Sequence, residues 1–332
     1  MKMRFLLSVC CAIAVASCGE QEPTHDRVEA IVVYASYADE AYLPALFEGY
    51  TSETGIRVSL RYADAEEIIE NVIEKRGSPP ADVLLADSAD GIWRAGDAGA
   101  LLPLVSELVE ERVPAQLRGP DGYWTAIAFR TTQILFDTQQ FSAADFGRYE
   151  DLAQPHFKNM LCLSSSSLAV NRSLIANLIR IHGRRPAEII VRGWMQNLAL
   201  PPYKTETELL QAIHAGTCAV GLVSSSESGL RQPRDEASRI AAVTPSPAHL
   251  SIEAAGVNRH ARQPEAARAL IDWLVSAAVQ ERHAAAIAMY PANAAARGQD
   301  MPLPQQPGGS NVAAAAWLSE DAVKLAERAA YR

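Results

Sequence analysis

The sequence lacks the short patterns that identify many enzymes. Its 332 residues contain no Gly-x-Ser-x-Gly, Ser-x-x-Lys, His-Glu-x-x-His, Cys-x-x-Cys or Gly-x-Gly-x-x-Gly pattern. The seven histidines are scattered. His182, His214, His260 and His283 fall at expected helix ends or exposed faces, where a solvated surface role is predicted. We therefore expect a protein that is not an enzyme.

Basic residues and long apolar runs are also scarce. Thirty Lys and Arg stand against 39 Asp and Glu, a formal charge of -9, which argues against a nucleic-acid partner. Beyond the N-terminus no apolar run reaches the roughly 18 residues needed to cross a bilayer. The chain is 48% hydrophobic and 21% charged, which is ordinary for globular domains. Its length allows two domains.

The N-terminus has the features of a secretory signal peptide. Lys2 and Arg4 precede the apolar stretch Phe5–Ala16. The following "VASC" resembles the lipobox of bacterial lipoproteins, in which the cysteine becomes the lipidated mature N-terminus. We expect residues 1–17 to be removed, Cys18 to carry lipid and residues 18–28 to form a tether. The alternative is a plain signal peptide that is cut elsewhere.

Cysteine is rare, and most of it is at the N-terminus. Of the five cysteines, Cys10 and Cys11 lie in the predicted signal peptide and Cys18 is the predicted lipid site. Cys162 and Cys218 remain, in a compartment that is oxidising. A disulfide between them is predicted, with two buried free thiols as the alternative.

Strand and helix patterns alternate along the chain, which argues for an α/β fold with a mostly parallel sheet covered by helices. Strands are expected at 29–34, 56–60, 81–87, 123–138, 161–163, 219–223 and 251–257. Helices are expected at 39–53, 65–75, 89–98, 171–182, 187–197, 205–215, 263–278 and 278–288. The run Tyr123–Thr138 is too long for one compact strand, so we expect it to cross between two lobes.

Two serine-rich segments each follow an apolar strand. Ser164–Ser167 precedes a helix, and Ser224–Ser228 contains the carboxylate of Glu227. Helix N-termini favour anions, and hydroxyls add hydrogen-bond donors. Helix capping would explain a single serine but not four. Ligand contact is therefore predicted here, and a purely structural role in helix capping is the alternative.

Four segments carry a resemblance to a known family. They are "VVYASYADEAYLPALFEGYTSETGIRV", "SPPADVLLADSADGIWRAGDAGALLPL", "LCLSSSSLAVNRSLIANLI" and "AIHAGTCAVGLV". The chain resembles the ferric-iron-binding solute-binding proteins of bacterial ABC importers from about residue 31 to residue 294. In some relatives the positions of Cys162 and Cys218 are both cysteine.

The resemblance implies a type II binding-protein fold of two α/β lobes, each a mixed sheet flanked by helices, with the ligand in the cleft. Lobe 1 is expected to comprise residues 29–127 and 252–292, and lobe 2 residues 128–251 and 293–332. Together with the predicted lipidation of Cys18, we expect a monomeric, membrane-anchored periplasmic lipoprotein. It would deliver its ligand to an ABC permease, and no nucleic-acid partner is expected.

The family's iron-binding tyrosines are not found at the matching positions. One tyrosine falls on Val170 and the tyrosine pair falls on Ser226 and Glu227, while a family arginine falls on Leu200. Ferric iron is a hard cation that prefers anionic oxygen ligands. A site of the family's usual composition is therefore not expected.

The residues that remain suggest two alternatives. By resemblance Asp87, Arg130 and Tyr37 fall at or near ligand positions. The predicted ligand-binding set is Tyr37, Asp87, Arg130, Ser165, Ser166, Ser226 and Glu227. Asp87 and Glu227 would be metal ligands if iron(III) is the cargo. A small anionic or organic solute is the alternative, and a lipoprotein that has lost ligand binding and serves as a partner protein is another.

Overall fold

The structure is a computed structural model, and it describes residues 30–36, 40–74, 80–228, 239–298, 303 and 312–332. Tyr37 and the predicted N-terminal segments, including Cys18, lie outside these residues. The strands are β1 Ile31–Ser36, β2 Val58–Ala63, β3 Val83–Ala86, β4 Leu101–Leu102, β5 Trp124–Asp137, β6 Leu161–Cys162, β7 Val220–Ser224, β8 Ile240–Val243, β9 Leu250–Asn258 and β10 Tyr290–Pro291.

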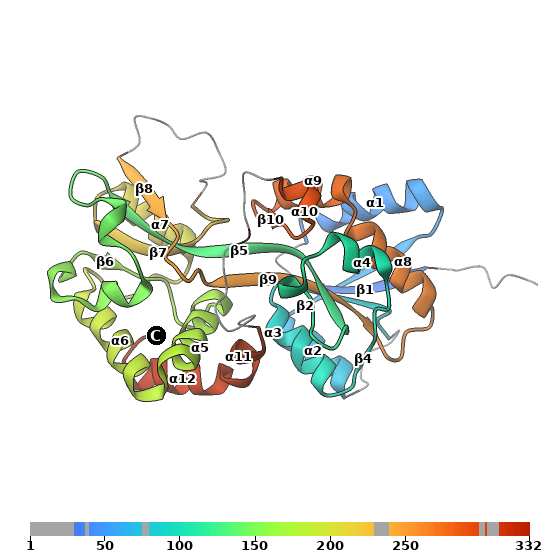
Figure 1. Ribbon diagram of the computed structural model, residues 1–332, viewed down its shortest axis with the longest axis horizontal. Coiled ribbons are helices and arrows are strands. Elements are labelled where there is room, and N and C mark those ends of the chain that lie inside the picture. Colours follow the sequence, from blue (N-terminus) through green and yellow to red (C-terminus); the bar gives the residue numbers. More distant parts are fainter. Residues whose placement is uncertain (1–29, 37–39, 75–79, 229–238, 299–302, 304–311) are drawn as a thin grey trace, which may run out of the picture.

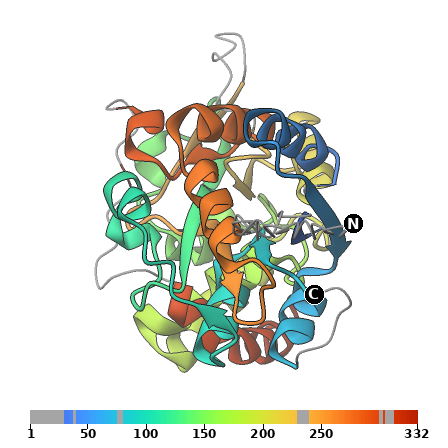
Figure 2. The same cartoon turned by 90° about the vertical axis from the view of Figure 1, so that its right-hand side faces the viewer.

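Helices follow most of the strands (Figure 1). They are α1 Leu43–Thr54, α2 Ala65–Ile73, α3 Ala89–Asp97, α4 Glu107–Arg112, α5 Ala169–His182, α6 Arg184–Asn197, α7 Glu206–His214, α8 Pro264–Leu274, α9 Ala277–Ala286, α10 Ala294–Arg297, α11 Val312–Trp317 and α12 Ser319–Arg328. Figures 1 and 2 show α1 and α9 on one side of the strands of the first half and α2 and α3 on the other. Among the described helices none is long and apolar enough to cross a membrane.

Strand β5 connects the two halves of the molecule, as the length of its apolar run predicts. Its residues Trp124–Thr131 pair antiparallel with β9, whereas Thr132–Phe136 pair with β7. The strand order is β2-β1-β3-β9-β5-β7-β6. The β1–β2, β1–β3 and β6–β7 pairs are parallel, and the pairs made by β5 and β9 are antiparallel. The sheet is therefore mixed rather than mostly parallel.

Two large hydrophobic cores lie on either side of this connection. The first packs α1, α2, α3 and α8 against β1, β3 and β9, and the second packs α5, α6 and α12 against β6 and β7. Two separate cores confirm the two-lobed α/β fold, while the exact lobe boundaries stay a prediction. Helices α4, α10, α11 and α12 and strands β4, β8 and β10 were not predicted.

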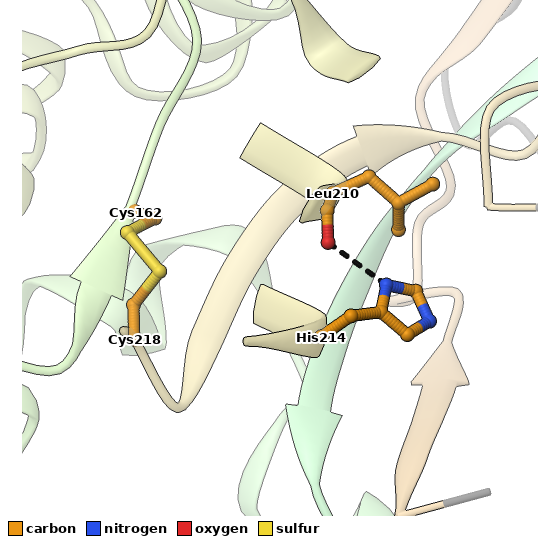
Figure 3. Close-up of a disulfide and its surroundings, with 4 residues drawn as sticks. All are labelled: Cys162, Leu210, His214 and Cys218. Carbon is orange, nitrogen blue, oxygen red and sulfur yellow. Dashed lines mark hydrogen bonds between the residues drawn. A yellow bond between two sulfur atoms is a disulfide. The ribbon is translucent and has the colours of Figure 1, made fainter. Parts of the chain in front are cut away.

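The disulfide predicted between Cys162 and Cys218 is present, with their Cα atoms 5.9 Å apart (Figure 3). Cys162 ends β6 and Cys218 comes two residues before β7, its parallel neighbour. Leu209 and Ile213 of α7 pack on the bridge in a small third core. The disulfide thus joins the two strands that lead into the two serine-rich segments.

Candidate functional site

A cavity of about 430 Å³ opens where β5 and β9 pass between the two halves. Its walls come from the ends of β3 and β7, the middle of β5 and β9, the start of α1 and the end of α9. The lining residues are Ala41, Tyr42, Asp87, Arg130, Ser226, Glu227, Glu253, Ala286, Ile287, Ala288 and Met289. Four of the seven predicted ligand-binding residues therefore meet in one cavity: Asp87, Arg130, Ser226 and Glu227.

The sheet register explains why residues distant in sequence meet here. Ala86 of β3 lies opposite Ala254 of β9, so the next residue, Asp87, comes beside Glu253. Arg130 of β5 lies opposite Ser251, which shares a face with Glu253 because side chains alternate along a strand. Directly paired residues of an antiparallel ladder have Cβ atoms about 4.5–5.5 Å apart. Two carboxylates and a guanidinium are thus fixed on one face of a rigid sheet.

Ser226 and Glu227 come from the turn that follows β7. Thr207 Oγ1 donates to Glu227 Oε2 at 3.2 Å, and the hydroxyls of Ser224 and Ser226 are 2.9 Å apart. Behind them Glu206, the first residue of α7, accepts from the Ser224 hydroxyl at 2.8 Å. The apolar strand therefore ends in a hydrogen-bonded turn that presents the Glu227 carboxylate to the cavity.

The cavity has an excess of negative charge. Among its described lining residues are three carboxylates, Asp87, Glu227 and Glu253, and one guanidinium, Arg130. Burial raises the pKa of Asp87, the Arg130 charge opposes this, and the nearby Glu253 raises the pKa further. Burial is also the main cause of the raised pKa of Tyr42. A bound cation would relieve the repulsion between neighbouring carboxylates.

Glu253 and Tyr42 were not predicted as site residues. Glu253 is 1% exposed and accepts from Nε2 of His283 of α9 at 2.9 Å, and His283 is fully buried. The prediction of a surface role for His283 was therefore wrong. The available signal was a glutamate in the middle of the apolar run "LSIEAAGV", because a charge within a buried strand needs a partner or a function.

A buried polar network around His249 lies within the electrostatic influence of Arg130. His249 Nδ1 lies 3.0 Å from Thr132 Oγ1, and its Nε2 lies 3.0 Å from the Ser173 hydroxyl of α5. The Tyr149 hydroxyl donates to the Thr132 carbonyl and accepts from the His249 amide. Burial, with the charge of Arg130, lowers the pKa of His249 to about 3, so the imidazole is neutral at ordinary pH.

The other predicted residues lie elsewhere or outside the described chain. Ser165 and Ser166 do not line this cavity, and the Ser166 hydroxyl donates to the Tyr331 carbonyl near the C-terminus. Val170, at a family tyrosine position, is buried in α5, and Leu200 is half exposed. Ligand contact by Ser165, Ser166 and Tyr37 stays a prediction.

A second cavity, of about 680 Å³, shares Asp87 with the first. It lies between α3, the start of α5 and the α11–α12 turn, with Ser167, Arg172 and Trp317 in its walls.

Within the described part of the chain, no group of three or more His, Cys, Asp or Glu side chains is arranged to hold a metal ion.

Comparison with known proteins places this chain in a family. Residues 78–315 match the family described as bacterial extracellular solute-binding protein. Iron uptake protein A1 of Synechocystis sp. is 31% identical over 245 residues, covering 71% of this chain and 68% of that protein. The Fe(3+)-binding periplasmic protein of Serratia marcescens is 24% identical over 271 residues, covering 79% of this chain and 78% of that protein.

A solved structure shows the same architecture. Trichodesmium IdiA (FutA), in complex with iron and citrate ligands, superposes with a TM-score of 0.78 and 30% identity, covering 91% of this chain and 100% of that one. Apo FutA2 from Synechocystis superposes with a TM-score of 0.76 and 27% identity, covering 92% of this chain and 100% of that one. The chain belongs to the bacterial extracellular solute-binding proteins, in the group that includes the periplasmic ferric-iron-binding proteins of ABC importers.

Proposed function

We propose that this solute-binding protein captures ferric iron as a complex with a small organic carboxylate and delivers it to an ABC permease. The observation that carries the proposal is the cavity between the two halves, where Asp87 and Glu227 lie with Arg130 and Ser226. One lining carboxylate comes from the β3 side and the other from the β7 side. A cargo held by both would bridge the two lobes.

The charge of the cavity favours a cation over a free anion. Its described lining has three carboxylates against one guanidinium. Carboxylate oxygens are suitable ligands for a hard cation such as Fe(III). An anion alone would meet Arg130, but it would also meet three carboxylates, one of them fully buried, so it is the weaker candidate.

The carboxylate co-ligand follows from what this chain has in place of the family's tyrosines. Val170, Ser226 and Glu227 supply one anionic oxygen ligand where the resemblance implies three phenolates. The cargo would supply the missing oxygens. Arg130 could hold the outer carboxylate, because guanidinium binds carboxylate in a bidentate manner and its Nε is buried without a hydrogen bond to any described residue.

A lipid anchor completes the proposal. The charged start, apolar segment and "VASC" support export followed by lipidation of Cys18, which would keep the carrier at a membrane near its permease. The polar residues that follow Cys18 would serve as the tether. A plain signal peptide would instead release a free periplasmic protein.

Metal binding tests the proposal directly. Protein purified without chelators would be dialysed against ferric citrate, and its iron content would be measured by elemental mass spectrometry. We expect about one iron per wild-type chain. Substitution of Asp87→Asn or Glu227→Gln would lower the affinity at least about 10-fold, because even losses outside the ligand set cost about 10–100-fold. Both variants remove one carboxylate with little change in side-chain volume.

Glu265→Gln is the matched control, because it removes a carboxylate whose side chain is 86% exposed on α8. It should bind iron as the wild type does. Citrate bound without iron would favour the anionic solute. Absence of both ligands would favour a lipoprotein that acts as a partner protein.

A further inference from the structure

The C-terminal segment connects the two halves of the molecule at a place apart from β5 and β9. Val312, the first residue of α11, is 4% exposed and packs in the first hydrophobic core. Leu318, directly after α11, packs against the second core, in which Ala322 and Leu325 of α12 are fully buried. Helix α11 therefore begins at one core and ends at the other, and Figure 1 shows it between α3 and α5.

Helix α11 is too short to follow both halves if they separate. Its six residues rise about 9 Å, at about 1.5 Å per residue. It contacts α3 of the first half and α5 of the second. These two helices also carry opposite charges that line the second cavity, Asp90 on α3 and Arg172 on α5. Burial raises the pKa of Asp90, and the charge of Arg172 opposes this, so the two side chains attract each other across the cavity.

Strands β5 and β9 form a narrow connection about which the halves can rotate. They pair with each other where they pass between the halves, so they act as one element. Periplasmic binding proteins close around their ligands by hinge motions of this kind. Helix α11 instead ends in the wall of the 680 Å³ cavity, and Figure 1 shows it apart from both strands. A rotation that widens this cavity must therefore break the contact of α11 with α3 or with α5.

An aromatic pair fixes the end of α11 to the first half. Trp317, the last residue of α11, meets Trp93 of α3 edge to face, with ring centroids 5.3 Å apart. Trp317 is nonetheless 67% exposed, so its ring buries little surface besides this contact. An aromatic pair of this geometry changes an equilibrium constant about 2- to 10-fold beyond the effect of burial. The contact is therefore strong enough to bias an open–closed equilibrium and weak enough to break.

We propose that α11 is a strap across the second cavity that limits how far the two halves open, and that the Trp93–Trp317 pair holds this strap in place. Neither ring lines the cavity that contains Asp87 and Glu227, so the pair would act on the motion of the halves and not on the cargo itself. The inference goes beyond the proposed function, because it concerns the protein without cargo.

A contact that only anchors the C-terminus predicts different behaviour. Helix α12 is already held by the second core. Loss of the Trp317 ring would then leave the separation of the halves unchanged, and its effect would be local. A strap predicts that the separation changes. Because Trp317 is mostly exposed, its removal should leave Tm close to that of the wild type.

The experiment measures the distance between the halves in iron-free protein. Spin-labelled noncanonical residues would replace Glu70 on α2 and Glu327 on α12, which are exposed and lie on helices that line opposite sides of the second cavity. Both cysteines of the disulfide stay unchanged. Pulsed electron paramagnetic resonance would give the distance distribution. We expect Trp317→Ala to raise the ratio of the longer to the shorter distance about 2- to 10-fold.

Matched variants separate the aromatic pair from general packing. Trp317→Phe keeps an aromatic ring and should keep most of the wild-type distribution. Trp93→Ala removes the other ring, so it should act as Trp317→Ala does, and the double variant should add little to either, because both changes remove one interaction. Ile189→Ala truncates an apolar side chain that is 63% exposed on α6, and it should leave the distribution unchanged.

Three results would overturn the inference. The first is an identical distance distribution in the wild type and Trp317→Ala. The second is a double variant whose effect equals the sum of the two single effects, because the rings would then act separately. The third is a shift in Ile189→Ala as large as that in Trp317→Ala. Since no iron is present in this measurement, its failure leaves the proposed function standing, and failure of iron binding leaves the strap standing.

Discussion

Removing the Cys162–Cys218 disulfide should destabilise the second half of the molecule by an amount that can be worked from the chain. The bridge closes a loop of 56 residues in sequence separation, which includes α5, α6 and α7. The chain-entropy relation gives about 4 kcal/mol for a loop of this length, and measured losses are about 2–5 kcal/mol. Both cysteines are buried against Leu209 and Ile213, so some apolar packing would also be lost.

The assay is urea unfolding of Cys162→Ala/Cys218→Ala beside the wild type, with and without a reductant. The double variant should lose about 2–5 kcal/mol, and reduced wild type should behave like the variant. Reductant should leave the variant unchanged, which makes it the internal control. If reduction does not shift the wild-type midpoint, the bridge does not constrain the unfolded chain and the reasoning fails.

Two other predictions concern the centre of the molecule. Arg130→Gln should weaken ferric citrate binding about 10- to 100-fold, because hydrogen bonds to charged groups contribute about 1.5–3 kcal/mol. Arg148 is exposed, so Arg148→Gln should bind ferric citrate as the wild type does in the same dialysis. His249→Gln should make unfolding less sensitive to acid. Burial lowers the folded pKa of His249 to about 3, below its usual value near 6.5. The unfolded chain therefore binds the extra proton first, and wild-type stability falls as pH drops from about 6.5 towards 3, by up to about 1.4 kcal/mol per unit. The free energy of unfolding of both proteins would be measured by urea titration at several pH values. An equal dependence of this free energy on pH in the two proteins would contradict the assignment.

Local patterns predicted the first half of the fold well. Helix α1 ends at Gly55, whose φ of 74° suits glycine, and α2 begins after Asp64, whose side chain accepts from the Glu66 amide. The long apolar run correctly predicted that β5 crosses between lobes. These features depend on residues near in sequence, which is why they can be read directly from it.

The cavity was only partly predictable, because its residues are brought together by sheet register. Asp87 and Arg130 were named through family resemblance, and Ser226 and Glu227 were also indicated by the serine-rich segment after an apolar strand. The structure brings the four together. Glu253 meets Asp87 only because β9 returns antiparallel beside β3, which no local pattern specifies. His283 was misjudged for a related reason, since its burial depends on contacts with Tyr42 and Glu253.

The serine cluster before α5 shows a different limit of prediction from the sequence. Its hydroxyls were predicted as ligand contacts, yet Ser166 donates to the Tyr331 carbonyl, and the Ser165 and Ser167 hydroxyls are 2.8 Å apart. Tyr331 follows α12, a helix that the sequence patterns did not reveal. The Ser166 hydroxyl therefore has a structural partner in a segment that local reasoning omitted, and ligand contact by this cluster stays a prediction.

Native mass spectrometry of the protein equilibrated with ferric citrate tests the central claim most directly. The proposed function predicts one adduct per chain with the combined mass of iron and citrate. Glu227→Gln should need at least about 10-fold more ferric citrate than the wild type to form the same fraction of that adduct, whereas the surface variant Glu265→Gln should form it at the wild-type concentration. Citrate bound without iron, or an unmodified chain mass at saturating ferric citrate, would contradict the account.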